Sequence, residues 1–431
     1  MKSIIIAIAL FSVAVARADV WTLDSCIHYA AEHNLQVRSS KASILQSEVG
    51  VDQAKSGYLP NVSASAGQAW NLGRGLTAEN TYADRNTSTF NWGANLSLPL
   101  FDGLRTPRQV KYAQASLSQI TEQYEAAKEN VSINVITAYL QVLYTKELLD
   151  VAHNQVELSE YELSRRRTLL DAGKIPEIDM LEAQSLLSTD RMNEVQAHNN
   201  YTMAKIDLMR LLNIDADVYD FDVAPLNERE VVIPKPEGVF DKAKVYNHSV
   251  AATKKGVAVS DANIKLSQSG YLPSVSFGSS IGSSYYKLSG YPNESFSDQM
   301  RHNYSTYFGF QLNVPIFDGL NTRNSVRRAK AERVAAELQY DQAVDELRHA
   351  INEAYYQAIG SYKKYESSKD AEEYAVKAFE AVSEKYNLGR ATSAEYEQSK
   401  TKALQSTAER VQACYELMLR ARILDFYSSP H

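Results

Sequence analysis

The sequence predicts a mainly α-helical protein with a small β part, in which long antiparallel helical hairpins adjoin four β-strands. The segment Leu96–Leu104 matches Leu312–Leu320 position for position, which indicates an internal duplication. In both copies an alternating apolar run, typical of a strand, leads into Pro and then Phe-Asp-Gly. A very long segment with helical periodicity follows each copy, so each half switches once from strand to helix.

The N-terminus has the pattern of a signal peptide. Lys2 precedes an apolar run over residues 4–15, and Ala16-Arg17-Ala18 is an A-x-A site, so we expect residues 1–18 to be removed. About a dozen apolar residues are too few for a membrane anchor. The chain is therefore expected to leave the cytoplasm.

Composition excludes several classes of protein. No run of 18 apolar residues follows Ala18, so a membrane role would have to come from alternating strands. The net charge of −7 argues against a nucleic-acid partner. Two cysteines rule out a disulfide scaffold, although a single bridge between Cys26 and Cys414 is left open.

The first repeat is expected over residues 19–213. A helix up to Ser56 is stopped by Gly57-Tyr58-Leu59-Pro60. The elements that follow are a strand pair at 60–100, a long helix at 103–172, a tip at 173–176 and a return helix at 177–212.

A linker rich in Asp, Pro and Val is expected at 214–238, before the second repeat at 239–431. Gly270-Tyr271-Leu272-Pro273 ends that repeat's first helix, as its counterpart does in the first half. The later elements are a strand pair at 273–316, a long helix at 319–387, a tip at 388–392 and a return helix at 393–427.

The return strands are apolar on one face and polar on the other. Phe90, Trp92 and Leu96 alternate with polar residues, and Phe308 and Leu312 do the same in the second copy. The polar face consists of Asn91, Asn95, Gln311 and Asn313. About ten such residues suit a tilted strand that crosses an outer membrane, while a soluble sandwich with one buried face is the alternative.

The helices are too long for a globular core. At 1.5 Å per residue each double-length helix extends on the order of 100 Å, which implies a coiled-coil-like assembly. Gly173 and Gly389 supply the C-caps at the two tips, and Pro176 or Thr392 begins the returning helix. Four strands are half of the smallest known barrel, so closure needs several chains, and three chains would give twelve strands.

The order of elements, the doubled junction and the Gly-centred tips resemble TolC-type outer-membrane efflux channels, over nearly the whole mature chain. The junction residues are Pro99, Phe101, Gly103, Pro315, Phe317 and Gly319. The resemblance implies a homotrimer in the Gram-negative outer membrane, with a 12-stranded β-barrel continuing into an α-helical tunnel through the periplasm. It also implies a passive exit duct for a tripartite efflux pump or a type I secretion system. A periplasmic adaptor would join the duct to an inner-membrane transporter of the resistance-nodulation-division or ABC type.

The resemblance also assigns residues to a periplasmic gate. Asp179 and Tyr386 fall on a pair whose hydrogen bond would tie the two hairpins together in the closed state. Glu395 falls on the first acidic ring, whereas Gln398 replaces the second acidic residue. The family's Arg link is displaced, since Arg390 lies one position early. The tip turns, expected to dock the adaptor, contain Gly173, Lys174, Pro176, Gly389 and Thr392.

Other charged or catalytic signals are weak. Arg165-Arg166-Arg167 is interpreted as a solvated helix face, with contact to an acidic adaptor or to neighbouring helices as the alternative. His28 and His33 are five residues apart and lack a carboxylate pair at metal-ligand spacing. No nucleophile elbow or phosphate loop is found, so we expect no enzyme, metal or cofactor.

Two other classes of protein compete with the channel. A periplasmic adaptor is also exported and contains a hairpin, but it would have one hairpin flanked by small β domains. A structural coiled-coil envelope protein would lack the alternating strands and the Gly-Tyr-Leu-Pro breaks.

Overall fold

The computed structural model describes residues 20–76, 80–215, 217–218, 220–226 and 233–428. The expected signal peptide, residues 1–18, lies outside this part of the chain. The fold is mainly helical with a small sheet, as the sequence predicts. None of the helices in the described residues is long and apolar enough to cross a membrane. Two compact units are formed, one by residues 1–41, 124–248 and 344–431 and the other by residues 42–123 and 249–343.

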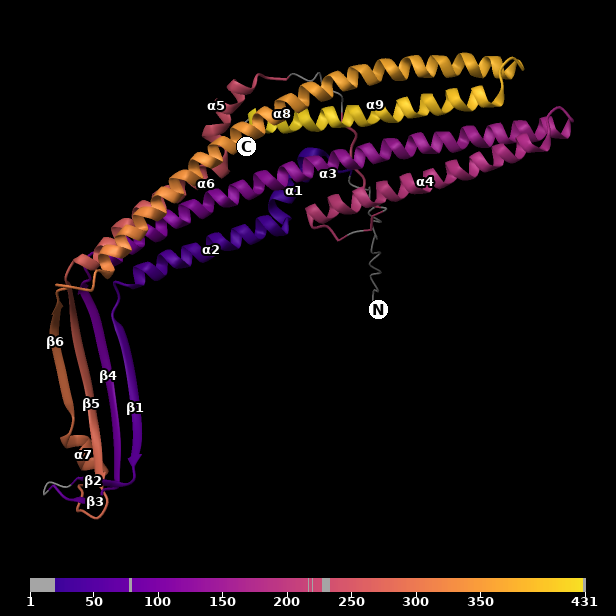
Figure 1. Ribbon diagram of the computed structural model, residues 1–431. Helices are drawn as coiled ribbons and strands as arrows, with labels where there is room; N and C mark the ends of the chain where they lie inside the picture. The colour runs from indigo at the N-terminus through magenta and orange to yellow at the C-terminus, as the bar shows by residue number, and fades with distance from the viewer. Residues whose placement is uncertain (1–19, 77–79, 216, 219, 227–232, 429–431) are drawn as a thin grey trace, which may run out of the picture. The chain divides into compact units, whose positions relative to one another are not determined.

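The first unit consists of helices that form two antiparallel hairpins (Figure 1). One hairpin pairs α3 (Arg105–Asp171) with α4 (Glu177–Leu212), and the other pairs α8 (Asn321–Asn387) with α9 (Ser393–Ser428). Both long helices have 67 residues and both return helices have 36. Only the parts of α3 and α8 beyond Tyr124 and Val344 belong to this unit.

The core of this unit lies where α1 (Leu23–His33) packs against α3 and α4. Cys26, Val135 and Leu208 are fully buried there. The Tyr139 hydroxyl, also inside, donates 2.6 Å to the carbonyl of Ala224 in the linker that follows α4. Linker and helices are thereby fixed to each other.

The single helix expected up to Ser56 is instead two, α1 and α2 (Leu35–Ser56). Asn34 adopts an extended conformation between them, and its side-chain oxygen accepts from the Gln36 N–H at 2.8 Å. Its amide nitrogen donates 2.7 Å to the carbonyl of Leu211. The second half repeats the break at Asn247, between α5 (Pro236–Tyr246) and α6 (His248–Ser267). Asparagine ends one helix because its side chain competes for backbone groups.

The second unit contains a four-stranded antiparallel sheet in the order β1-β4-β5-β6 (Figure 1). Its strands are β1 (Asn61–Asn71), β4 (Thr87–Phe101), β5 (Ser274–Leu288) and β6 (Ser305–Asn313). The two repeats join directly, since β4 pairs with β5. The polar loops also contain structure, namely β2 (Arg74–Leu76) paired with β3 (Tyr82–Asp84), and α7 (Phe296–His302).

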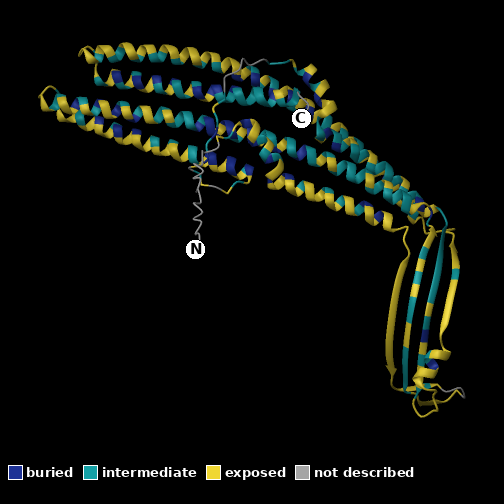
Figure 2. Cartoon of the chain, turned by 180° about the vertical axis from the view of Figure 1, so that it is seen from behind, coloured by how far each residue is buried: buried dark blue, intermediate teal, exposed yellow. Residues whose placement is uncertain are grey.

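The outer strands β1 and β6 are exposed nearly throughout (Figure 2). Neither outer strand has a partner on its free side among the described residues. The sheet is therefore open along both edges.

Each junction from strand to long helix uses the repeated Phe-Asp-Gly-Leu. Gly103 and Leu104 both have positive φ, of 69° and 62°, and the second copy does the same. A Cβ on Gly103 would lie 2.9 Å from the Ser269 carbonyl oxygen, so the position requires glycine. The Asp102 carboxylate then accepts from the Thr106 N–H at 2.6 Å and caps α3. Asp318 caps α8 in the same way through Thr322, at 2.7 Å.

Candidate gate at the helical tips

The two tips have the same turn, a Schellman motif. Gly173 has a φ of 68°, and the N–H groups of Gly173 and Lys174 bond back to Leu170 and Leu169 at 2.8 and 2.9 Å. At the second tip Gly389 has a φ of 69°. There the N–H groups of Gly389 and Arg390 bond to the carbonyls of Tyr386 and Lys385. Both long helices are therefore closed by glycine, as the sequence predicts.

The return helix α9 begins with a capping box. The Glu395 N–H donates 3.2 Å to the Thr392 hydroxyl, and the Glu395 carboxylate accepts from the Thr392 N–H at 2.7 Å. These hydrogen bonds lower the pKa of the Glu395 carboxyl. The residue expected in the acidic ring therefore also holds the turn. Pro176 begins α4 without a side-chain cap, and Glu177 and Asp179 supply negative charge to its first turn.

Tyr386, near the end of α8, contacts the other hairpin. Its hydroxyl donates 2.9 Å to the Glu162 carboxylate on α3. Its ring stacks on Tyr396 with the centroids 4.7 Å apart, and the Arg165 guanidinium lies 4.7 Å from the ring centroid. The resemblance implied Asp179 as the partner, but a phenol has one proton and here it goes to Glu162. Tyr386 does link the two hairpins.

Arg166 is buried between the hairpins, so the interpretation of the Arg165-Arg166-Arg167 run as a solvated face was wrong for its central residue. The Arg166 guanidinium lies 3.2 Å from Glu162 on α3 and 3.5 Å from Glu397 on α9. It also donates 3.0 Å to the main-chain carbonyl of Asp179 on α4. One guanidinium with several donors thus satisfies groups on three helices.

Lys400, on α9, lies further from the tip and is almost completely buried. Its ammonium donates 2.9 Å to the Ser159 hydroxyl, which in turn donates 2.5 Å to the Asp190 carboxylate on α4. Burial lowers the pKa of Lys400, and it raises the pKa of Glu397, 3.9 Å away. Both shifts reflect the free-energy cost of keeping a charged group away from water.

We call these side chains the inter-hairpin cluster. Its members are Ser159, Glu162, Arg165, Arg166, Asp190, Tyr386, Glu397 and Lys400. Three cations face three carboxylates, so the formal charges balance. Removal of one partner from such a buried set leaves an uncompensated charge.

The remaining predicted gate residues are not in the cluster. Arg390, Glu395 and Gln398 are exposed at the second tip, and Lys174 is exposed at the first. Sequence reasoning missed Glu162, Arg166, Glu397 and Lys400. The signal on α3 was spacing: the buried stripe that includes Val156 continues through Ser159, Glu162 and Arg166 at steps of three and four. Polar residues on a stripe that faces other helices must be paired.

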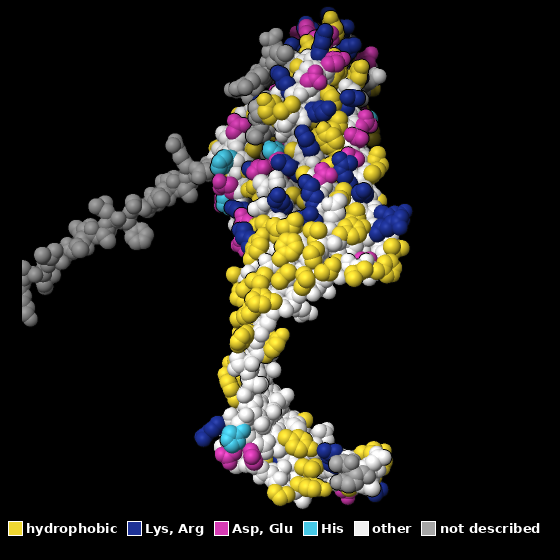
Figure 3. Space-filling view, turned by 90° about the vertical axis from the view of Figure 1, so that its left-hand side faces the viewer, with side chains coloured by type: hydrophobic (Ala, Val, Ile, Leu, Met, Phe, Trp, Pro, Cys, Tyr) yellow, Lys and Arg dark blue, Asp and Glu magenta, His cyan; other side chains and the backbone are white. Residues whose placement is uncertain are grey.

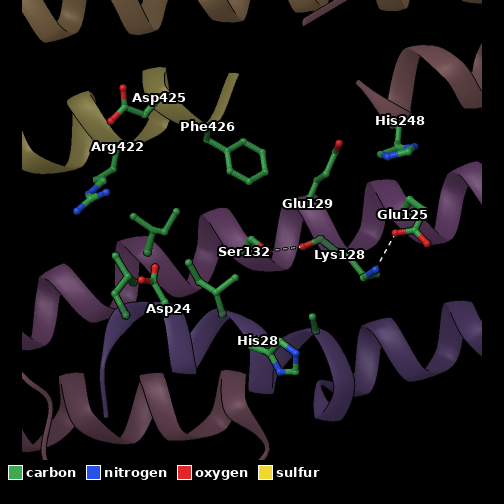
Figure 4. Close-up of a pocket in the computed structure, with 14 residues that line it drawn as sticks. Asp24, His28, Glu125, Lys128, Glu129, Ser132, His248, Arg422, Asp425 and Phe426 are labelled. Atoms are coloured by element: carbon green, nitrogen blue, oxygen red, sulfur yellow. Dashed lines mark hydrogen bonds and ion pairs between the residues drawn. The ribbon is translucent and has the colours of Figure 1, made fainter. Parts of the chain in front are cut away.

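A cavity of about 740 Å³ lies in the same unit, among α1, α3, the start of α6 and the end of α9 (Figure 4). Asp24 and Asp425 line it together with Arg422, while Lys128 pairs with Glu125 at 2.8 Å. The described residues contain no group of three or more side chains suited to hold a metal ion. The cavity therefore presents charges of both signs without a metal-ligand set.

Comparison with known proteins gives the family. The model of the family described as outer membrane efflux protein matches residues 26–213 and 239–425, which fall within the two expected repeats. Outer membrane efflux protein BepC of Brucella suis is 23% identical over 371 residues, covering 86% of this chain and 77% of BepC. Outer membrane protein TolC of Escherichia coli is 22% identical, covering 90% of this chain and 78% of TolC.

Solved structures agree on the fold. The outer membrane channel CmeC of Campylobacter jejuni superposes with a TM-score of 0.76 at 16% identity, covering 94% of this chain and 85% of CmeC. The proteins that this chain resembles are efflux proteins and channels rather than enzymes. Because the family model matches both repeats and most of the residues, the chain belongs to the outer membrane efflux protein family.

Proposed function

We propose that this outer membrane efflux protein works as a homotrimeric, passive exit duct whose helical tips are opened by a periplasmic adaptor. An inner-membrane transporter, of the resistance-nodulation-division or ABC type, would deliver cargo through the adaptor. The duct serves either a tripartite efflux pump or a type I secretion system. It needs no cofactor, because it moves cargo by its shape and by the electrostatics of its mouth.

The open sheet is the observation that supports the trimer most strongly. Four strands with unpaired edges at β1 and β6 expose backbone donors and acceptors, which have no water partners inside a membrane. Three copies joined edge to edge would close twelve strands into a β-barrel and pair every edge.

The two faces of the strands suit lipid on one side and water on the other. Phe308, Phe310 and Leu312 are each more than 60% exposed in the single chain. Exposure of these apolar side chains to water costs free energy, and lipid would remove that cost by covering them. Asn91, Asn95, Gln311 and Asn313 alternate with apolar residues and would line the aqueous path.

The inter-hairpin cluster supports a gate at the tips. Tyr386 and Arg166 hold the second hairpin to the first, and an open tunnel mouth requires the hairpins to move apart. The adaptor would dock on the turns that contain Gly173, Lys174, Pro176, Gly389 and Thr392, and so disturb the nearby links. The exposed Glu395, beside Gln398, would favour cations at the mouth.

An adaptor or a filament protein fits the chain less well. Two hairpins with a shared four-stranded sheet differ from the single hairpin expected of an adaptor. A filament protein has no need of an open sheet with exposed Phe and Leu.

Bilayer recording on the purified full chain tests the proposal. Light scattering in detergent should give three chains per particle, and a planar bilayer should show a small, discrete conductance. Folded trimers that never conduct would contradict the duct, and a folded monomer absent from the outer-membrane fraction would contradict the trimer and the site of action.

A further inference from the structure

The first turns of α8 contain cations where a helix favours anions. Glu332, the first acidic residue of the helix, is preceded by four exposed cations, namely Arg323, Arg327, Arg328 and Lys330. The carboxylate of Asp318, just before the helix, is already used to cap it. Because the positive end of the helix dipole repels cations, this placement costs stability and needs another reason.

Three of these cations form one exposed stripe. Arg323, Arg327 and Lys330 follow the spacing i, i+4, i+7 and share a helix face, whereas Val326 and Ala329 between them are buried. None of the three forms an ion pair with any residue that the structure describes. The next cation, Arg333, differs, since it pairs with Asp261 at 2.6 Å and Glu337 at 2.8 Å. The positive charge of the stripe is therefore not neutralised by any residue that the structure describes.

The stripe follows directly on a band of exposed apolar side chains at the junction. Ile316 is 95% exposed and Phe317 is 78% exposed, and Leu320 is nearly half exposed. Figure 3 shows hydrophobic side chains gathered where the strands meet the helices, with Lys and Arg side chains beyond them. The apolar band is followed by the cations along the chain, in the same order as the hydrocarbon layer of a bilayer is followed by its headgroup layer.

The distances fit a headgroup layer. From Leu320 the helix rises about 4.5 Å to Arg323, about 10 Å to Arg327 and about 15 Å to Lys330, at 1.5 Å per residue, so Arg323 and Arg327 lie nearest to the layer. Each headgroup layer is roughly 5–8 Å thick, and an arginine side chain can reach several ångströms back toward it. In the first repeat one of the three equivalent positions is a cation, since Lys111 on α3 occupies the position of Arg327 and is also exposed.

We propose that Arg323 and Arg327 bind the anionic headgroups of phospholipids in the periplasmic leaflet of the outer membrane, with Lys330 adding positive charge behind them. This inference rests on the proposed function, because it requires the strands to cross the membrane and α8 to leave it on the periplasmic side. The negative charge of phosphate and glycerol-phosphate groups complements the positive charge of the stripe. Lipid binding accounts both for the cations at the helix start and for the apolar band before them.

Competition between lipids on the purified protein tests this. The full chain in nonionic detergent is titrated with fluorescent phosphatidylglycerol, and with phosphatidylcholine as the zwitterionic comparison. Each cation near an anionic surface raises the binding affinity about fivefold. R323Q/R327Q should therefore bind phosphatidylglycerol roughly 25-fold more weakly than wild type, and its affinity for phosphatidylcholine should change little. Charge-preserving R323K/R327K should bind as wild type does.

The matched control neutralises two exposed cations far along the same helix, in K363Q/K369Q, and should also bind as wild type. Equal phosphatidylglycerol affinity in R323Q/R327Q and wild type would overturn the inference. Loss of the trimer in R323Q/R327Q would also overturn it, because the stripe would then face a second copy. Conductance and outer-membrane fractionation of the wild type report separately on the proposed function.

Discussion

Replacement of Tyr386 by Phe removes one link between the hairpins and leaves the rest of the cluster in place. A hydrogen bond to a charged group contributes about 1.5–3 kcal/mol. Because Tyr386 is half-buried and Glu162 retains contacts to Arg165 and Arg166, loss of this bond should destabilise the closed state by about 1 kcal/mol per chain. If the three chains of a trimer open together, the closed state loses about 3 kcal/mol in total, and a 1:99 ratio of open to closed becomes roughly 1:1.

Single-channel recording in a planar bilayer measures this shift. Y386F should raise the open probability from about 1% to about half, if the three chains open together, whereas Y374F should not, because Tyr374 is 70% exposed on the same helix. D179A should resemble the control, since Asp179 contributes its main-chain carbonyl to Arg166. A Y386F channel as closed as wild type would refute the role of the bond to Glu162. A D179A channel as open as Y386F would show that the Asp179 side chain supplies the link instead.

Three further predictions concern the helical unit. K400A should lower the free energy of unfolding, followed by circular dichroism, by about 3–5 kcal/mol, because it leaves buried carboxylates without their cation. K402A, which removes an exposed lysine from the same helix, should leave the free energy of unfolding unchanged. Burial raises the pKa of the Cys26 thiol to about 12, so maleimide should label it only after denaturation, and labelling of the folded protein would contradict its burial. The hydrogen bond to Glu194 raises the pKa of His153 above 6.5, so its stabilising contribution is complete below pH 6.5 and is lost as the pH rises through the raised value. An NMR titration should find this raised pKa and its return toward 6.5 in E194Q; equal values in both proteins would contradict it.

The disulfide that the sequence left open is not formed. Cys26 and Cys414 are both buried, and neither forms a disulfide in the structure. Nothing in their spacing could have decided this, because pairing depends on where two distant helices place the thiols.

Much of the architecture follows from local patterns. Alternation located the strands, helical periodicity located α3 and α8, and Gly173 and Gly389 marked the tips, because left-handed turns favour glycine. The doubling of these signals made the duplication visible. The position of Asn34 as a helix break was missed, since its effect depends on a contact with Leu211 on a distant helix.

The contacts of the gate were decided only by tertiary structure. The sequence by itself determined that Tyr386 lies just before the second tip and that Arg166 lies just before the first. That Tyr386 donates to Glu162, and that Arg166 is buried against Glu397, depends on how two hairpins more than 200 residues apart in sequence pack together. From sequence alone, a charged residue on a helix is predicted to be exposed to water unless the face on which it lies is known to be covered. Local physics therefore fixes where helices and strands begin and end, while long-range packing selects which charges are removed from water and must be paired.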